Sequence, residues 1–156
     1  MKTIYFEDLN SGDEFWSGEF PVDEAEMLDY NRRFDPWPMH VDEAAARDSL
    51  FGGLIASGGY TLGLMYRSGH FVYKNEDTAW AFLVGLDWKV KFLLPVRPGD
   101  RLRNRISIQD KRPSSKPGRG VVFVRNEMFN QEQQLVLQCD MVLLVATRPG
   151  ETQEIP

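Results

Sequence analysis

The chain has 156 residues, of which 42% are hydrophobic and 26% are charged, and these values are typical of a globular protein. The length favours a single domain spanning residues 1–156, with residues 150–156 as a flexible tail. No segment has the ~20 consecutive apolar residues that cross a bilayer, and no basic and apolar leader follows Met1. We therefore expect a cytoplasmic protein that does not contact a membrane.

Charge and cysteine content narrow the class further. The net charge is −5, and residues 1–50 hold 13 acidic and 4 basic side chains, whereas residues 51–156 hold 10 and 14. An acidic chain argues against nucleic acid as a partner, because a surface that tracks phosphates needs a basic excess. Cys139 is the only cysteine, so no internal disulfide can form, and its apolar neighbours predict a buried thiol.

The first predicted elements in chain order are a short strand and a helix. Residues 15–20 predict the strand, which Pro21 closes. Asp23 is a suitable N-cap, and Glu26 follows three residues later, a spacing that resembles a capping box. The helix that begins there has an apolar stripe made of Met27, Tyr30 and Phe34.

This helix is expected to end at Asp35, because a residue that precedes a proline avoids the helical conformation. We expect a loop over residues 35–41. Asp42 then predicts the cap of a brief helix that contains three consecutive alanines, and residues 51–53 predict a turn.

The segment over residues 57–73 is the longest helical candidate, with Ser57 as its N-cap. It contains no acidic residue and is rich in glycine, so its helix propensity is poor. Burial inside a sheet would have to stabilise such a helix, because small residues allow close approach of the backbone. An irregular buried loop is the alternative.

From Thr78 onward the hydrophobic pattern changes to period two, which is typical of strands. Apolar residues alternate with lysine or arginine at Trp88, Val90 and Phe92 and at Leu102, Ile106 and Ile108. Residues 121–129 and 135–146 predict a hairpin. The order of elements predicts an α+β fold in which four or five antiparallel strands surround one central helix.

Three stretches of the sequence resemble a known family. FDPWPMHVD at residues 34–42, followed by FGGLIASG at 51–58, is similar to the hydratase motif of MaoC-like proteins, which include dehydratases and (R)-specific enoyl-CoA hydratases. LPVRPGDRL at 94–102 resembles the strand-entry turn of that family. The resemblance implies a hotdog fold, an antiparallel sheet wrapped around a central helix. It also implies a lyase of fatty acid metabolism that reversibly adds water to a trans-2-enoyl thioester to give an (R)-3-hydroxyacyl thioester.

That reaction needs a base for water, a proton for C2 and a donor for the charge that develops on the thioester oxygen. By resemblance, Asp35 and His40 match the catalytic pair. A histidine side chain can take a proton from water at neutral pH, and Asp35 can hold that water or shuttle the C2 proton. The division of the protons between the two stays open. An extended chain would separate them by up to ~17 Å, so the chain must fold back, and Pro36 and Pro38 restrict it.

Gly58 matches the glycine whose amide receives the thioester oxygen in the family. If Ser57 is the N-cap, its hydroxyl binds the amide of Gly59 or Tyr60 and leaves the Gly58 N–H free at the positive end of the helix. A free amide there is an oxyanion donor. The missing β-carbon of Gly58 would also let the substrate carbonyl approach closely.

Trp37, Phe51 and Ser57 are the residues expected to bind substrate. Trp37 lies between two prolines, where its ring can narrow the space for the acyl chain. His70 lacks catalytic partners, and we expect a structural role for it. Neither histidine nor cysteine occurs at metal-ligand spacing and no phosphate loop is present, so no metal or cofactor is expected beyond the CoA or carrier-protein pantetheine of the substrate.

Two other functions stay open. A hotdog acyl-CoA thioesterase would have the same fold, but such enzymes commonly place an acid on the central helix, and residues 57–73 contain none. A non-catalytic acyl-thioester-binding protein would keep the pocket without the chemistry. In that case Asp35, His40 and Gly58 would have no reason to occur together.

Two further features predict contacts with other molecules. A sheet that wraps a helix leaves an exposed edge, and the resemblance implies a homodimer or a higher homo-oligomer. Residues 89–125 hold 11 Lys or Arg against 2 Asp, so the phosphates of CoA can bind there, with Arg101, Arg103 and Arg105 on one strand face. A solvated sheet face is the alternative.

Overall fold

The structure is a computed structural model, and it describes residues 1–150. The tail expected at residues 150–156 lies, apart from Gly150, outside the described residues. The elements are β1 (Lys2–Ile4), a short 3-10 helix η1 (Phe6–Asp8), β2 (Glu14–Trp16), β3 (Phe20–Pro21), α1 (Glu24–Phe34), α2 (Pro38–Val41), α3 (Glu43–Arg47), α4 (Gly58–Tyr73), β4 (Thr78–Trp80), β5 (Phe82–Phe92), β6 (Arg101–Pro113), β7 (Arg119–Phe129) and β8 (Leu135–Ala146).

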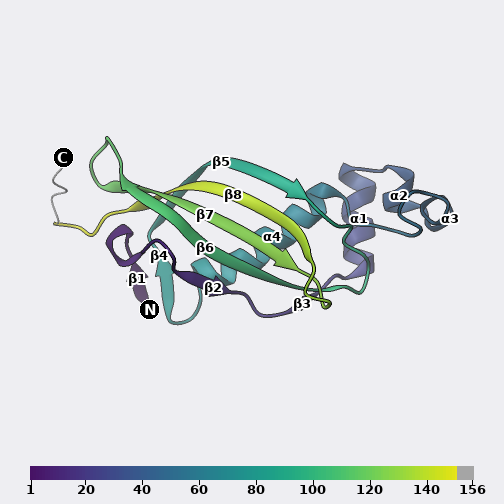
Figure 1. Ribbon diagram of the computed structural model, residues 1–156, viewed down its shortest axis with the longest axis horizontal. Coiled ribbons are helices and arrows are strands. Elements are labelled where there is room, and N and C mark those ends of the chain that lie inside the picture. Colours follow the sequence, from purple (N-terminus) through teal and green to yellow (C-terminus); the bar gives the residue numbers. More distant parts are fainter. Residues whose placement is uncertain (151–156) are drawn as a thin grey trace.

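The main sheet is antiparallel and lies across α4. Its strands are ordered β2-β6-β7-β8-β5, and β3 also pairs with β6. α4 runs along one face of the sheet, and α1, α2 and α3 gather at one end of it (Figure 1). This arrangement confirms the predicted α+β fold, with an antiparallel sheet around a central helix.

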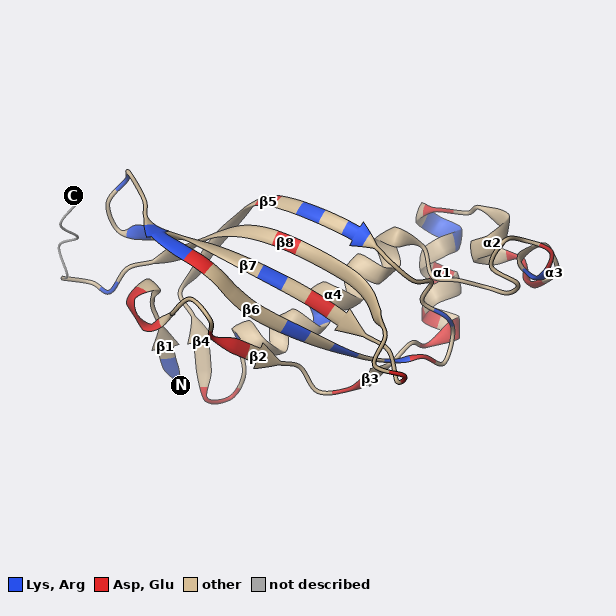
Figure 2. Ribbon diagram, in the orientation of Figure 1, with Lys and Arg blue, Asp and Glu red and all other residues tan. Residues whose placement is uncertain are grey.

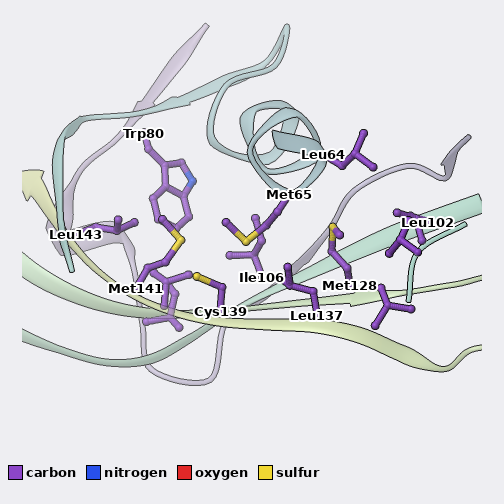
Figure 3. Packing of buried hydrophobic residues seen from close by; sticks show 14 of the residues in the cluster. Leu64, Met65, Trp80, Leu102, Ile106, Met128, Leu137, Cys139, Met141 and Leu143 are labelled. Carbon is purple, nitrogen blue, oxygen red and sulfur yellow. The ribbon is translucent and has the colours of Figure 1, made fainter. Parts of the chain in front are cut away.

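The core lies between α4 and the inner face of the sheet. Inward residues of β7 and β8 alternate with outward ones, as the period-two pattern predicts, and the hairpin is confirmed. Met65 of α4 points toward Ile106 of β6, and Cys139 lies among the same buried side chains (Figure 3). Cys139 is fully buried as predicted, and its burial raises the pKa of the thiol to about 11.

The glycine-rich segment is a helix and not an irregular loop. The hydroxyl of Ser57 accepts a hydrogen bond from the Tyr60 N–H, which confirms the N-cap. A β-carbon on Gly69 would lie 3.7 Å from Ile106 Cδ1, so α4 runs within van der Waals distance of β6 at this position. Burial against the sheet therefore stabilises a helix of low intrinsic propensity.

Two predicted boundaries near the N-terminus are wrong. The strand expected at residues 15–20 is two short strands, β2 and β3, because Ser17 lies between them and its hydroxyl accepts the Asn104 N–H of β6. Pro21 is the last residue of β3, as expected of the residue that closes a strand, and β3 pairs with β6. The loop expected over residues 35–41 contains the short helix α2, because Pro38 occupies its first position with a φ suited to a helix.

The apolar stripe and capping box of α1 also differ from the prediction. Asp23 accepts the Glu26 N–H as an N-cap should, but the Glu26 carboxylate binds Tyr60 and Arg67 of α4 and is not available for a reciprocal box. Met27 is buried, whereas Phe34 is 70% exposed. The inner face of α1 therefore passes through Met27 and the residue one turn later, Asn31, which is fully buried.

The small parallel sheet was not predicted, whereas the unpaired edge of β5 agrees with the exposed edge expected from the sequence. β1 and β4 form a separate two-stranded parallel sheet. β5 pairs with β8 along one edge only, and the chain from 82 to 94 exposes eight large apolar side chains: Phe82, Leu83, Val84, Leu86, Trp88, Phe92, Leu93 and Leu94. Among residues 1–150 no helix is long and apolar enough to cross a membrane.

Candidate active site

The site forms where α1 ends and α2 begins, at the end of the sheet that also holds the first turn of α4 (Figure 1). Asp35 is the C-cap of α1, and its N–H donates to the Asn31 carbonyl. The Trp37 N–H returns to the Asp35 carbonyl at 2.9 Å, which bends the chain before Pro38 starts α2. This bend brings His40 Nε2 to 3.7 Å from Asp35 Oδ2, so the predicted fold-back is present.

The hydrogen bond of the His40 ring determines which nitrogen faces Asp35 as an acceptor. Nδ1 lies 3.0 Å from the Ile55 carbonyl, and a carbonyl can only accept, so Nδ1 carries the proton in the neutral ring. Nε2 then carries the lone pair of the ring and lies 3.7 Å from Asp35 Oδ2. His40 is 6% exposed, whereas the Asp35 side chain is 38% exposed. The pair therefore combines a buried base with an acid open to solvent.

The N-terminus of α4 contributes free backbone donors. Ser57 caps the Tyr60 N–H and its carbonyl accepts from Thr61, but the N–H groups of Gly58 and Gly59 have no hydrogen-bond acceptor within the described chain. These two amides lie at the positive end of a 16-residue helix. An oxyanion can therefore bind there without competing for a bond that the fold already uses.

Gly58 also lies against an aromatic side chain of β5. A β-carbon there would lie 2.9 Å from Cζ of Phe92, at the end of β5. The absence of a side chain thus accommodates Phe92, which is itself 55% exposed. Close approach of a substrate is not what this contact shows.

Asn31 belongs to the site and was missed. Its side chain is fully buried, its Nδ2 donates to the His40 carbonyl at 3.0 Å, and its Oδ1 accepts from the Ser57 N–H at 3.3 Å. A polar residue one turn after buried Met27 on the inner face of α1 is the signal that could have revealed it, because the helical spacing places both on one face.

The three expected substrate-binding residues occupy different environments. Ser57 has no exposed surface, so its hydroxyl caps α4 and does not face a substrate, contrary to expectation. Trp37 is the N-cap of α2 and is 63% exposed. Phe51 is partly buried, and its carbonyl accepts from Arg97 Nη2 at 2.6 Å. Arg97, which was not predicted, thus ties the 51–53 turn to the turn that precedes β6.

The basic strand face is largely engaged by its own sheet. Arg101 pairs with Glu19, the Arg103 guanidinium lies over the Trp16 ring, and Arg105 pairs with Glu127. Basic and acidic residues both occur on the strands of this sheet (Figure 2). These contacts favour the solvated-face alternative over a site for CoA phosphates.

Two further observations concern residues away from Asp35 and His40. His70 is exposed and lines an apolar cleft of about 590 Å³ with Trp80 and Trp88. Within residues 1–150, no group of three or more His, Cys, Asp or Glu is placed to hold a metal ion.

Comparison with known proteins identifies the family to which the chain belongs. Residues 12–128 match the model of the MaoC like domain. The chain belongs to the MaoC-like family. A relative, the uncharacterised protein YdeM of Bacillus subtilis (strain 168), is 26% identical over 144 residues, which cover 89% of this chain and 96% of that protein.

Solved structures agree with this assignment. The MaoC-like dehydratase from Rhodospirillum rubrum is 34% identical, with a TM-score of 0.85 and coverage of 94% of this chain and 99% of that one. The (R)-hydratase PhaJ1 from Pseudomonas aeruginosa is 22% identical, with a TM-score of 0.70 and coverage of 98% and 94%, and shows the shared fold. Membership of the family supports a hydratase or dehydratase kind of enzyme.

Proposed function

We propose that this MaoC-like protein reversibly adds water to a trans-2-enoyl thioester to give the (R)-3-hydroxyacyl thioester, without a metal or cofactor. The observation that carries the proposal is the joint placement of three groups. His40 presents a lone pair at Nε2, Asp35 lies 3.7 Å from it, and the free amides of Gly58 and Gly59 begin the adjacent helix. They supply a base, a carboxylate that stabilises the base once it is protonated, and an oxyanion donor. The protonated pair then returns the proton to C2, so the three functions that hydration requires are available.

The first step uses His40 as the base. Nε2 takes a proton from water while the water oxygen forms a bond to C3 of the substrate. The positive charge on the ring is stabilised by the Asp35 carboxylate, and the proton on Nδ1 stays hydrogen-bonded to the Ile55 carbonyl, which holds the ring in one orientation. The electron pair of the C2–C3 double bond moves toward the thioester carbonyl.

The second step completes the addition. The thioester oxygen carries the enolate-like charge, and the Gly58 N–H stabilises it at the positive end of α4. A proton from the charged His40–Asp35 pair then adds to C2, so water is added without a net change in the protonation of the protein. The reverse sequence of steps dehydrates the 3-hydroxyacyl thioester.

One assay separates this function from its two rivals. The protein is mixed with a panel of trans-2-enoyl-CoA substrates of different chain length, in the presence of EDTA, and the absorbance of the conjugated thioester and the release of free thiol are followed together. We expect loss of absorbance without thiol release and an (R)-3-hydroxyacyl product on a chiral column. Thiol release would indicate a thioesterase, and binding without either change would indicate an acyl-thioester-binding protein.

We also propose that two copies of the chain associate through β5. Its second edge is unpaired within the described residues, and its apolar side chains are exposed on both faces. Such an edge favours pairing with an identical strand, which forms a closed two-fold interface.

Light scattering tests this association. The wild type should have the mass of a dimer, and Leu83→Lys with Leu86→Lys should give a monomer, because charges on the edge oppose strand pairing. Leu50→Lys is the matched control, since Leu50 is 94% exposed outside β5. A wild-type monomer at micromolar concentration would contradict the proposal.

A further inference from the structure

Asn31 joins three elements that each contribute one functional group. It lies on α1, one turn before Asp35, and its backbone carbonyl accepts the Asp35 N–H. Its side-chain amide donates to the carbonyl of His40 on α2 and accepts from the N–H of Ser57, which immediately precedes Gly58. A single residue is thus bonded to the acid, to the base and to the start of the oxyanion helix.

The two side-chain bonds specify how the amide is oriented. The His40 carbonyl can only accept, and the Ser57 N–H can only donate, so only one of the two amide orientations satisfies both. Asn31 is 0% exposed, so water cannot replace either partner. A buried carbonyl and a buried N–H without partners are both destabilising, which favours this arrangement over one that breaks either bond.

From these contacts we infer that Asn31 is a positioning residue that sets the His40 base and the Gly58 amide at the distance the reaction needs. The inference rests on the proposed hydration. Asn31 does not itself touch the reacting atoms, because it is fully buried and both of its bonds are to backbone groups. Its effect is exerted through the backbone of α2 and the N-cap of α4, so its loss affects the transition state more than the binding of substrate.

Two substitutions of Asn31 remove different combinations of its side-chain hydrogen bonds to His40 and Ser57. Asn31→Leu removes both with nearly the same volume. Asn31→Asp keeps an acceptor for the Ser57 N–H but places an oxygen against the His40 carbonyl. Both variants should lower kcat by about 10–100-fold with KM nearly unchanged, because misplacement by ~1 Å can cost up to 10² in rate. A variant whose Tm falls while kcat and KM per folded molecule stay at the wild-type values would overturn the inference.

A matched control comes from the same core. Asn126 is 1% exposed, and its side chain bonds Asn104 and Met141 on the inner face of the sheet. It pairs with Ile106, which lies beneath Gly69 in the C-terminal half of α4, away from the first turn. Asn126→Leu should lower stability as Asn31→Leu does but leave kcat unchanged. An equal loss of kcat in both would assign the effect to general loosening of the core.

A double-mutant cycle identifies the path of the effect. If Asn31 acts partly through the Gly58 amide, Asn31→Leu should cost less in a Gly58→Pro background, where that amide is already absent. Fully additive costs in all backgrounds, including His40→Ala, would contradict an action through these groups.

Amide hydrogen exchange measured by NMR provides a readout that needs no turnover. Asn31→Leu should speed exchange at the Ser57 N–H, whereas Asn31→Asp and Asn126→Leu should leave it protected. If the wild type hydrated no enoyl thioester, the proposed function would fail, but the exchange data would still test the bridge. Unchanged Ser57 exchange in Asn31→Leu would overturn the inference independently of activity.

Discussion

The first turn of α4 and its C-terminal half belong to one buried helix, yet they differ in what they bind. The first turn has free N–H groups at Gly58 and Gly59, and Tyr60 and the N-cap Ser57 form hydrogen bonds to α1. The C-terminal half packs small and apolar residues against β6 and β8. The proposed chemistry therefore depends on a few hydrogen-bonding groups at the first turn of α4, whereas stability depends on close packing in its C-terminal half. Variants at the two ends should therefore separate rate from stability.

The largest expected effect is at the catalytic pair. Asp35→Asn and His40→Ala should each reduce kcat by about 10²–10⁴-fold, because proton transfer by a positioned group contributes that much. Thermal unfolding should change little for Asp35→Asn, since that side chain is partly open to solvent. Enoyl-CoA hydration and circular dichroism on the same samples check both statements. Full activity in either variant would remove the pair from the mechanism.

The next effect concerns the Gly58 amide. Gly58→Pro deletes the N–H at the first helical position, where proline is tolerated and Ser57 already has an extended conformation. Turnover should fall by about 10²–10³-fold, the usual cost of losing one oxyanion donor. Gly58→Ala keeps the donor and adds the same β-carbon, which must displace the Phe92 ring. An equal loss in the two variants would assign the effect to that contact and not to the hydrogen bond.

The opposite end of α4 should show the reverse behaviour. Ile106 is fully buried beneath Gly69, and Ile106→Val removes one methylene equivalent from this packing. We expect a loss of about 0.5–1.5 kcal/mol in the free energy of unfolding, with kcat per folded molecule unchanged. Urea denaturation and steady-state kinetics measure the two quantities. A drop in kcat with no loss of stability would show that the two ends are coupled.

The smallest effect depends on pH and concerns the ion pair that joins α1 to α4. Hydrogen bonds from Arg67 and Tyr60 lower the pKa of Glu26 below its usual value. A carboxyl with a lowered folded pKa stabilises the protein above its unfolded pKa, and that contribution is lost as pH falls through the folded pKa. Because the pair is about half exposed, Glu26→Gln should cost less than about 1 kcal/mol at pH 7.

This prediction is checked by urea unfolding at several pH values. The difference between wild type and Glu26→Gln should shrink as pH is lowered below the unfolded pKa and through the lowered folded pKa, because the carboxyl is protonated in both states below the folded pKa. Glu24→Gln, an exposed residue in the same turn of α1, is the control and should show no such dependence. A difference that stays constant with pH would mean that the charge of Glu26 is not the cause.

The sequence alone predicted those elements that depend on residues close together along the chain. The caps at Asp23, Asp42 and Ser57 are correct, because an N-cap bond joins residues only three apart. The β7–β8 hairpin and the central helix were also predictable. Asp35, His40 and Gly58 were found through the resemblance of their motif, and the structure places His40 beside Asp35 and leaves the Gly58 amide free at the helix end.

Only the tertiary structure decided the features that depend on partners far along the chain. The strand expected at 15–20 divides because Ser17 bonds to Asn104, 87 residues later, and β1 pairs with a strand beyond α4. Helical spacing from Met27 can place Asn31 on the inner face of α1, but only the fold brings its partners His40 and Ser57 to it. Hydrogen bonds and close contacts act over a few ångströms in space, whereas sequence patterns report only neighbours along the chain, so the motif indicated the reacting groups and the fold alone specified how they are held together.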